Sequence, residues 1–587
     1  MGGRALEGET LRYRLRLAGL ASGRAARSLA LRAAAPYHIL RAMHLRAPAR
    51  LRIAPQDIRT ADSTFADEIY AGYFSFDGKT ANVQGRSPFS IAPPSDAWRR
   101  SLAGFAWLRH LRAADKALAR ANAQALVADF LLPRKFQPED PAFAPAVTAR
   151  RMLSWLAHSP LLLEDADAEF YEAFLAALAR GARALSRALD SGAAQGADRL
   201  FCAVALAQYC VCADVGRVAL DRATRTLDRE LDEQILVDGG HIGRNPQVVL
   251  ELLLDLLPLR QVYAARSAHP PESALHAIDR MIPFLRMMQH GDGSLALFNG
   301  MGATTQDRLA TIFAHDDAPG AVSLNAPHAG YQRMEGGDAV VIVDAGPPPP
   351  LEFSRSAHAG CLAFEFSLGE ERIVVNCGSP GGSHEQAREL ARATAAHSTL
   401  IVDDRSSCRI AAGEGRRKGV AGLIVAGPRN VRVDRRHSAR GQVLDMSQDG
   451  YAAEYGLVHE RVLALAAEGD RLIGHDKLLA AGGGKLRKTT PDFVLRFHIH
   501  YRMRVAPVYN GDAIELITPS GRRLLFEAAG ARPQIEESIF FAAAEGMRKC
   551  VQIVLTGVAE PQTKIRWAFR IAPEDATSGA VPPGPDV

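Results

Sequence analysis

Two histidines interrupt otherwise regular strand patterns in the second half of the chain. His358 precedes the alternating run "CLAFEFSLG", and His397 precedes the short run "STLIVDD". Imidazoles on neighbouring strands can bind a metal ion or contact an acidic sugar. A histidine at a strand edge is also commonly a hydrogen-bonded structural residue, so both interpretations stay open at this point.

A second group of reactive side chains lies in "VDGGHIGRNP", between two predicted helices. The glycine pair predicts the end of one helix, and Asn245 with the following proline predicts the N-cap and first turn of the next. These helix ends do not account for His241 and Arg244. An imidazole can move a proton and a guanidinium can bind an anion, so the loop is a candidate site that includes Asn245.

The first half of the chain is predicted to be helical. From Trp98 to about Gln289, apolar residues recur at helical spacing, with short polar, Gly or Pro breaks between the runs. The clearest runs are Val147–Ala157, Ala166–Leu189, Arg199–Cys212, Val218–Leu236, Pro246–Leu257 and Pro271–Met287. Seven or eight helices with short connections predict antiparallel hairpins arranged as a bundle, a solenoid or a toroid.

Around Gly330 the apolar period changes from 3.6 to 2, and more than ten short strand patterns follow one another. This pattern predicts a large antiparallel β-sandwich. The alternation is strict between residues 362 and 368, so one face should pack in the sandwich while the other meets water or another domain. The proline tract Gly346–Pro350 is predicted to be a stiff surface loop.

The predicted fold class is therefore a multidomain α + β protein. Residues 1–95 form a basic N-terminal arm and a small packing segment, and 96–320 form the helical domain. Residues 321–572 form the antiparallel sandwich, and 573–587 form a disordered tail. A chain of 587 residues is too long for a single core, which agrees with this division.

Charge and composition exclude several classes of protein. The net charge is only +5, yet residues 1–50 carry a local charge of +8 from ten arginines and two glutamates. An arm of this kind is typical of a solvated face or a subunit contact, so a homodimer is one interpretation, and no nucleic-acid partner is predicted. The seven cysteines show no CxxC pair and no zinc-ligand spacing.

Membrane and export signals are weak. No apolar run reaches the roughly 18 residues that a membrane span needs, so no integral membrane segment is predicted. The piece "LAGLASG" near the N-terminus is short and is followed by arginines without a clean cleavage site. Without a clear signal peptide, a cytoplasmic location is one alternative.

Several motifs resemble, in their order and spacing, the heparinase II/III-like family. The runs "AHAGCLAFEFSLGEERIVVNCGSPG", "RATAAHSTLIVDD", "YGLVHERVLALAAEGDRLIGHDKL" and "LRFHIH" resemble its C-terminal domain, and "DGGHIGRNP" and "FAWLRHL" its N-terminal half. Together they cover roughly residues 60–570. The resemblance implies an incomplete α/α toroid followed by a large antiparallel β-sandwich. It also implies a polysaccharide lyase of the cell envelope or periplasm, acting on acidic, uronate-containing glycans such as heparan sulfate or alginate.

Such a lyase works by β-elimination, which needs three chemical functions. One group neutralises the uronate carboxylate, a second removes the C5 proton, and a third protonates the leaving oxygen at C4. The resemblance places His358 and His397 on two family histidines. The candidate catalytic residues are His241, Tyr331, His358 and His397, and the candidate substrate-binding residues are Arg199, Arg244, Asn245 and Arg392.

The chain departs from the family pattern at the expected metal site. Some members hold a structural zinc with the two histidines and an intervening aspartate, where this chain has Asn376. Neutral asparagine is a poor zinc ligand, so His358, Asn376 and His397 are only weak candidates, and no cofactor is predicted.

Further departures affect the lyase chemistry. Asp198 and Arg199 stand where the family carries an Asn-His pair, and Val248 stands where it carries a tyrosine. The alternative prediction is therefore a non-catalytic protein that binds acidic glycans or assists the assembly of envelope polysaccharide. Hydrolysis by paired carboxylates is possible in a helical toroid but is not predicted, because Asp238, Glu251 and Asp255 are interpreted as cap and helix-surface residues.

Overall fold

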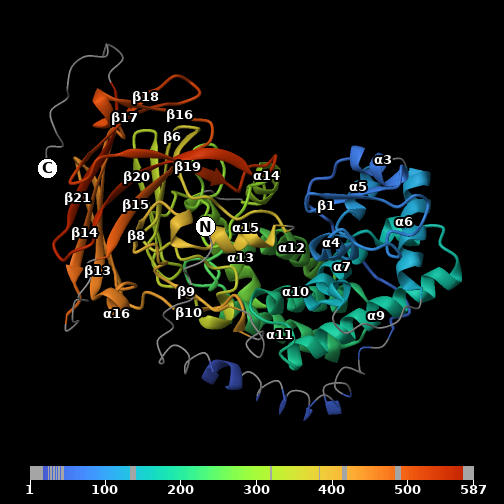
Figure 1. Cartoon of the computed structure of the whole chain (residues 1–587). Coiled ribbons are helices and arrows are strands. Elements are labelled where there is room, and N and C mark those ends of the chain that lie inside the picture. The colour runs from blue at the N-terminus through green and yellow to red at the C-terminus, as the bar shows by residue number, and fades with distance from the viewer. Residues whose placement is uncertain are drawn as a thin grey trace.

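The computed structural model describes residues 47–572 apart from 115, 133–139, 317–319, 383, 413–419 and 483–490, with scattered positions between 18 and 45. The tail predicted at 573–587 and most of the basic arm lie outside the described residues. The chain forms a helical half and, beside it, two large β-sheets (Figure 1). Among the helices described, none is long and apolar enough to cross a membrane.

The helical half forms an incomplete toroid of helical hairpins. It begins with α3 (Thr64–Tyr70) and a hairpin of β1 (Tyr73–Phe76) and β2 (Lys79–Asn82). The helices that follow are α4 (Asp96–Gly104), α5 (Leu108–Ala113), α6 (Lys116–Leu131), α7 (Pro145–Ala157), α8 (Ser159–Leu163), α9 (Ala168–Asp190), α10 (Ala197–Cys212), α11 (Arg217–Gln234), α12 (Pro246–Ala265), α13 (Glu272–Met287) and α14 (Gln306–Phe313).

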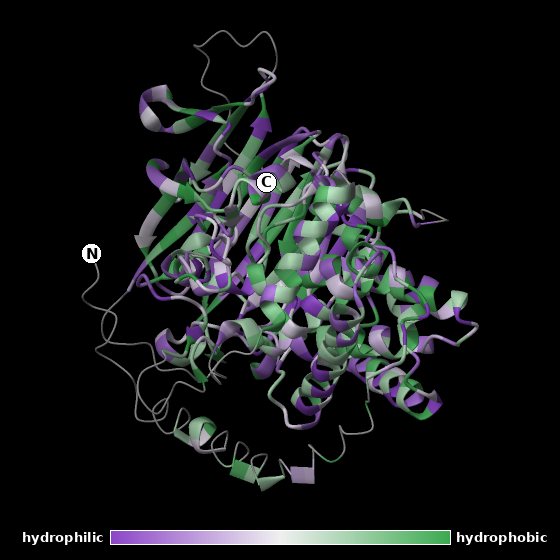
Figure 2. Ribbon diagram, turned by 90° about the vertical axis from the view of Figure 1, so that its right-hand side faces the viewer, coloured by the Kyte–Doolittle hydropathy of each residue, from purple (hydrophilic) through white to green (hydrophobic). Residues whose placement is uncertain are grey.

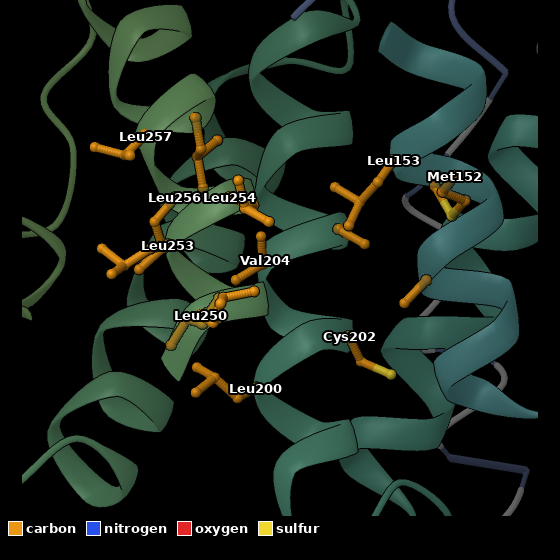
Figure 3. Packing of buried hydrophobic residues seen from close by; sticks show 14 of the residues in the cluster. Met152, Leu153, Leu200, Cys202, Val204, Leu250, Leu253, Leu254, Leu256 and Leu257 are labelled. Atoms are coloured by element: carbon orange, nitrogen blue, oxygen red, sulfur yellow. The ribbon is translucent and has the colours of Figure 1, made fainter. Parts of the chain in front are cut away.

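Helix α10 is the centre of the helical half. Nearly all of its residues from Leu200 onward are buried, and α7, α11 and α12 pack around it. Figure 3 shows Val204 of α10 facing the leucines of α12, with α7 on the other side. Full burial of one leucine stabilises a fold by about 1.5–3 kcal/mol, so this contact surface is a major part of the core.

Helix α12 is longer than its sequence pattern predicts. The helix begins where expected, because the Asn245 side chain accepts a hydrogen bond from the Gln247 amide at 2.9 Å. It then continues through Pro258 to Ala265, eight residues past the predicted end at Leu257. A proline inside a helix costs about 3 kcal/mol, and burial of the apolar residues beyond it offsets this cost.

The second half is a sandwich of two antiparallel sheets in the described part of the chain. The first sheet has the order β11-β12-β13-β14-β21-β18-β17-β16 and the second has the order β19-β20-β15-β7-β6-β5-β4-β3, with β8 also paired to β15. Their strands are β3 (Asn325–Ala326), β4 (Tyr331–Gly336), β5 (Ala339–Asp344), β6 (Phe364–Leu368), β7 (Glu371–Val375), β8 (Leu400–Val402), β11 (Val431–Ser438), β12 (Gly441–Gln448), β13 (Leu457–Ala466), β14 (Arg471–Ala480), β15 (Asp492–Ile499), β16 (Arg504–Val508), β17 (Ala513–Ile517), β18 (Arg523–Ala529), β19 (Gln534–Phe540), β20 (Arg548–Val558) and β21 (Lys564–Ile571).

Strand β6 shows how the two halves meet. Its apolar residues point into the sandwich, where the Phe364 ring stacks on Trp567 at 5.4 Å. Its polar residues point toward the helical half, where Glu365 and Ser367 hydrogen-bond to His290. The second face of this strand therefore meets another domain and not water. Figure 2 shows the same alternation of hydrophobic and hydrophilic residues along other strands.

We expect the sandwich core to depend on a glycine opposite Trp567. A Cβ atom at Gly474 would lie 1.9 Å from the indole ring, so the Gly474→Ala variant should lose about 1–3 kcal/mol of stability. Thermal unfolding measures this loss. Gly320→Ala is the control, because a Cβ there meets no atom within 4 Å. Equal unfolding temperatures for the two variants would contradict the packing argument.

Candidate functional site

Four of the predicted site residues meet in one buried polar network between the helical half and the sandwich. The network consists of Arg244, Asn299, Tyr331, Asp344, His358 and His397. None of these residues is more than 5% exposed. We refer to these six residues as the interface network. Its members come from sequence segments far apart, so burial between the halves brings them together.

Arg244 holds the centre of the interface network. Its guanidinium forms an ion pair with Asp344 and donates to the backbone carbonyls of Ala329 and Gly330. It also donates to the carbonyls of residues 346 and 347 at the start of the proline tract. The predicted surface loop is therefore anchored at its first residues, while Pro347 and Pro350 are exposed. The backbone of Arg244 has a positive φ of 63°, a strained conformation that its contacts must stabilise. All of these donors serve the domain contact, and none is free for substrate.

Tyr331 is held in the same network. Its hydroxyl donates to the Arg244 carbonyl and accepts a hydrogen bond from the Asn299 amide at 2.8 Å. Asn299 also donates to Asp344 at 3.1 Å. Burial and the nearby Asp344 carboxylate raise the pKa of Tyr331, although the Arg244 guanidinium opposes this shift. The phenol is therefore protonated, and both its donor and an acceptor position are occupied.

The two histidines form a short relay. His397 donates from Nδ1 to the Ala393 carbonyl at 2.8 Å, so its Nε2 accepts from Nδ1 of His358 at 3.0 Å. Burial lowers the pKa of both rings, and for His358 the neighbouring His397 and Arg392 lower it further. Both rings are therefore neutral. In the described residues no hydrogen bond reaches Nε2 of His358, which leaves one imidazole lone pair available.

The residues around this pair do not fit a zinc ion. Asn376 uses its amide oxygen to accept from the Ser398 amide at 3.0 Å, and its amide nitrogen donates to Glu365 at 3.2 Å. The facing nitrogens of His358 and His397 are engaged with each other. Within the residues described, no group of three or more His, Cys, Asp or Glu side chains is arranged to hold a metal.

The other predicted residues lie outside the interface network. Burial lowers the pKa of His241 to about 3, and its ring donates to Gln234 and accepts from the Gly243 amide. Gln234 in turn bonds to Glu230, which forms the ion pair with Arg199. This chain of contacts closes the end of α11 against α10. Both nitrogens of His241 are therefore hydrogen-bonded, and the Arg199 guanidinium is paired with Glu230.

Asn245 and Arg392 also have structural partners. Asn245 caps α12 as described above. Arg392 donates to the carbonyls of Ser354 and Ala357 at 2.9 and 2.8 Å, and burial lowers its pKa to about 10. These contacts fix the chain just before His358. The substrate-binding role of both residues stays a prediction.

An open cleft lies elsewhere, on the helical half. Its volume is about 570 Å³, and none of the eight predicted catalytic or substrate-binding residues is among those that line it. We refer to it as the arginine cleft. Its lining includes five arginines, two carboxylates and three aromatic rings, namely Arg59, Arg100, Arg109, Arg150, Arg308, Asp77, Glu251, Phe65, Phe76 and Trp107. The charge of the lining is therefore positive.

Two carboxylates on α12 organise the arginines. Glu251 pairs with Arg59 at 3.1 Å and with Arg308 at 2.6 Å, and Asp255 pairs with Arg150 at 2.6 Å. Burial alone would raise the pKa of Glu251, but Arg59 and Arg308 lower it to about 2. The sequence interpretation of Asp255 as a helix-surface residue is wrong, because Asp255 is buried, whereas Glu251 is partly exposed and lines the cleft. Cations from distant segments lie against this face of α12.

Arg109 and Arg100 differ from the other arginines of the cleft. Within the described part of the chain, the Arg109 guanidinium donates to the backbone carbonyls of Thr60 and Ala106 and to no other group, and burial lowers its pKa to about 10. Among the residues described, Arg100 has no ion pair or hydrogen bond. Neither guanidinium forms a close ion pair in the described residues, although Asp57 and Glu251 act on Arg109, and Arg100 acts on Asp198, over longer distances. A guanidinium whose donors are not all used by carboxylates favours the binding of an anion.

His110, beside Arg109, is a hydrogen-bond donor to the cleft and not a base. Its Nδ1 accepts from the Asp62 amide at 2.9 Å, and burial and Arg109 lower its pKa to about 4. The neutral ring must then carry its proton on Nε2. The arginine cleft therefore offers donors and positive charge, and its lining includes no tyrosine.

Only one sequence signal pointed to this cleft. The motif "FAWLRHL" contains Trp107, Arg109 and His110, and it carried the family resemblance without being given a role. Arg59 and Arg308 lie 249 positions apart in the sequence (308 − 59) and have no local pattern in common. Arg59 and Arg308 come together only because both contact Glu251 of α12 in the folded helical half.

Comparison with known proteins identifies the family. Residues 318–568 match the family model described as heparinase II/III-like, C-terminal. The chain is also 34% identical over 570 residues to FtsZ-localized protein C from Caulobacter vibrioides (strain NA1000 / CB15N), covering 92% of this chain and 95% of that protein. The chain belongs to the heparinase II/III-like family.

Solved structures agree with this membership at the level of the fold. A heparinase III structure superposes with a TM-score of 0.64 at 12% identity, over 85% of this chain and 80% of that one. The heparan sulfate lyase HepC from Pedobacter heparinus superposes with a TM-score of 0.57 at 15% identity, over 97% and 92%. The predicted toroid and sandwich of a heparinase II/III-like protein are thus confirmed.

We expect the Arg244–Asp344 pair to be essential for the contact between the two halves. Asp344→Ala leaves a buried guanidinium without its carboxylate, which should cost about 3–5 kcal/mol. Thermal unfolding measures the loss. Asp434→Ala removes a carboxylate that lies 3.4 Å from Arg436 in an exposed pair, and it should change stability by less than about 1 kcal/mol. Similar losses in both variants would refute the central role of Asp344.

Proposed function

We propose that this heparinase II/III-like protein binds an acidic glycan in the arginine cleft without cleaving it. The observation that carries the proposal is the separation of charge from proton-transfer groups. The cleft has the cations and aromatic rings that an acidic sugar chain needs for binding. The predicted proton-transfer residues His241, Tyr331 and His397 are buried, and their hydrogen-bonding positions are occupied.

The chemistry of elimination explains why this separation matters. A base must come within about 3 Å of the C5 proton while a cation neutralises the carboxylate of the same sugar. In the arginine cleft, His110 is a donor whose free nitrogen already carries a proton. Binding energy is therefore available there. The two carboxylates of the lining already have partners, because Glu251 pairs with Arg59 and Arg308 and Asp77 accepts a hydrogen bond from Ser101.

The name of one relative supports the same proposal. FtsZ-localized protein C is named for a location and not for a reaction. We extend this to a location with FtsZ for the present chain, where it would assist the assembly of envelope polysaccharide. Under this proposal the glycan is a ligand that recruits or positions the protein, and the family fold is retained for its cleft.

A lyase that cleaves uronate chains is the second candidate. The observation that favours it is the free lone pair on Nε2 of His358, supported by the relay through His397 to the Ala393 carbonyl. Such a relay would stabilise a proton accepted by His358. Under this alternative the halves must separate enough to admit a sugar.

One assay separates the two candidates. The purified protein is mixed with alginate, heparan sulfate, chondroitin sulfate, hyaluronan and polygalacturonate, and binding is measured beside the ultraviolet absorbance of the C4–C5 double bond. We expect binding of at least one polymer with a flat absorbance. An absorbance that rises with wild type and not with His358→Ala would establish the lyase instead, and no binding to any polymer would refute the proposed function.

We expect Arg109 to contribute most of the affinity for the acidic group. Arg109→Gln removes a desolvated cation without breaking an ion pair, so binding should weaken about ten- to hundredfold. Calorimetric titration with the best-binding polymer measures the change. Arg112→Gln is the matched control on the same helix, because Arg112 lies outside the lining and donates to the Ala157 carbonyl. Equal affinities for the two variants would place the anion elsewhere.

A further inference from the structure

A second pocket, of about 570 Å³, lies where the helical half meets the sandwich. Figure 1 shows α14 beside β19, and both contribute to the lining. We refer to it as the mixed pocket, and its lining includes Asp292, Glu371, Arg372, His500, Tyr501 and Phe540. Gln306 of α14 also lines it, whereas Arg308 of the same helix lines the arginine cleft. Residues two positions apart point to different sides of a helix, and the two linings share no residue, so the two sites are separate.

Three rings in mutual contact form an apolar part of the mixed pocket. The centroid of the Tyr501 ring lies 4.5 Å from that of His500 and 5.4 Å from that of Phe540. His500 also meets Phe540 edge-on at 5.3 Å. Pro519 and the alanines 542–544 add further apolar surface to the lining. A surface of this kind gives a ligand contact area, while its orientation depends on the polar groups around it.

Asp292 brings a fixed carboxylate from the helical half. Its Oδ1 accepts hydrogen bonds from the Ser294 amide at 2.8 Å and the Ser294 hydroxyl at 2.6 Å, and its backbone carbonyl accepts from the Gln306 side chain at 2.8 Å. Burial alone would raise the pKa of Asp292, but Arg372 and the Ser294 hydrogen bonds lower it, so the carboxylate is ionised. Among the residues described, no hydrogen bond reaches its Oδ2. That oxygen is therefore available to an N–H group of a ligand.

Three consecutive residues, His500, Tyr501 and Arg502, bring the other polar groups from the sandwich. Within the described ranges of the chain, their side chains form no hydrogen bond or ion pair. The Arg502 guanidinium lies over the Tyr501 ring, 5.6 Å from its centroid, which leaves the N–H donors for a carboxylate. Burial, together with Arg372 and Arg502, lowers the pKa of His500 to about 3, so the ring is neutral. A neutral imidazole and a phenol can each donate and accept, as the N–H and C=O groups of a peptide bond require.

We propose that the mixed pocket binds a short zwitterionic peptide, with Asp292 contacting its ammonium group and Arg502 its carboxylate. A purely anionic ligand would meet four carboxylates in the lining, and a purely cationic ligand would meet Arg502; the carboxylates are those of Asp292, Glu370, Glu371 and Glu545. A ligand that carries both charges satisfies both sets of groups. The volume of about 570 Å³ is that of a small-molecule site. This inference does not rest on the proposed function, because the glycan is assigned to the arginine cleft.

The test uses small peptides whose two ends are varied. Calorimetric titration measures the binding of four tripeptides that have alanine at both ends and alanine, leucine, lysine or glutamate between them. Each is used free, with an acetylated N-terminus, and with an amidated C-terminus. We expect at least one free peptide to bind, and each cap to weaken its binding about tenfold or more, because each removes one charge-assisted hydrogen bond. Binding of no free peptide, or equal binding of free and capped forms, overturns the proposal.

Three variants locate the bound peptide. Asp292→Asn keeps one oxygen for the Ser294 bonds but removes the charge, so it should bind the free and the acetylated peptide equally. Arg502→Gln changes an exposed side chain and should bind the free and the amidated peptide equally. Arg504→Gln is the control and should keep wild-type affinity, because Arg504 lies outside the lining. If Asp292→Asn and Arg502→Gln both keep the wild-type preference for free peptide, the peptide binds elsewhere and the proposal is wrong.

Discussion

The buried ion pair between Arg244 and Asp344 is the interaction on which the arrangement of the two halves depends. A guanidinium taken out of water is stable only when nearly all of its donors and its charge are satisfied. Here the acceptors come from the sandwich, while the arginine comes from a loop of the helical half. Gly330 and Gly346 leave room for the guanidinium, since a Cβ on either would lie within 3 Å of it. The ion pair and the hydrogen bonds of Arg244 therefore fix the position of one half relative to the other.

The same burial determines the chemistry of the groups around the pair. In this buried site, Tyr331 stays protonated and His358 and His397 stay neutral, so each takes part in hydrogen bonds that strengthen the contact. Groups that would move protons in an open cleft thus act as part of the interface. The arginine cleft, by contrast, is lined by arginines, aromatic rings and His110. Positive charge attracts a uronate chain, but elimination also needs a base.

Local patterns in the sequence were sufficient for most of the fold. The run at 246–257 predicted α12 together with its Asn245 cap, and the alternation at 362–368 predicted β6, because both depend on residues a few positions apart. The order of the motifs also predicted the family. The same patterns assigned Glu251 and Asp255 to an exposed face, since the apolar spacing of α12 says nothing about Arg59, which lies 192 residues before Glu251.

The sequence by itself determined the helical half, the sandwich and the residue types available for chemistry, because helix and strand periods are properties of neighbouring residues. Only the tertiary structure decided which of these residues meet water. Burial between two domains, and the pKa values that follow from it, depend on contacts between residues from 39 to 100 positions apart in the sequence. His358 and His397 meet as the sequence predicted, but in a buried interface. Arg100 and Arg109, which carried no such prediction, line the open cleft.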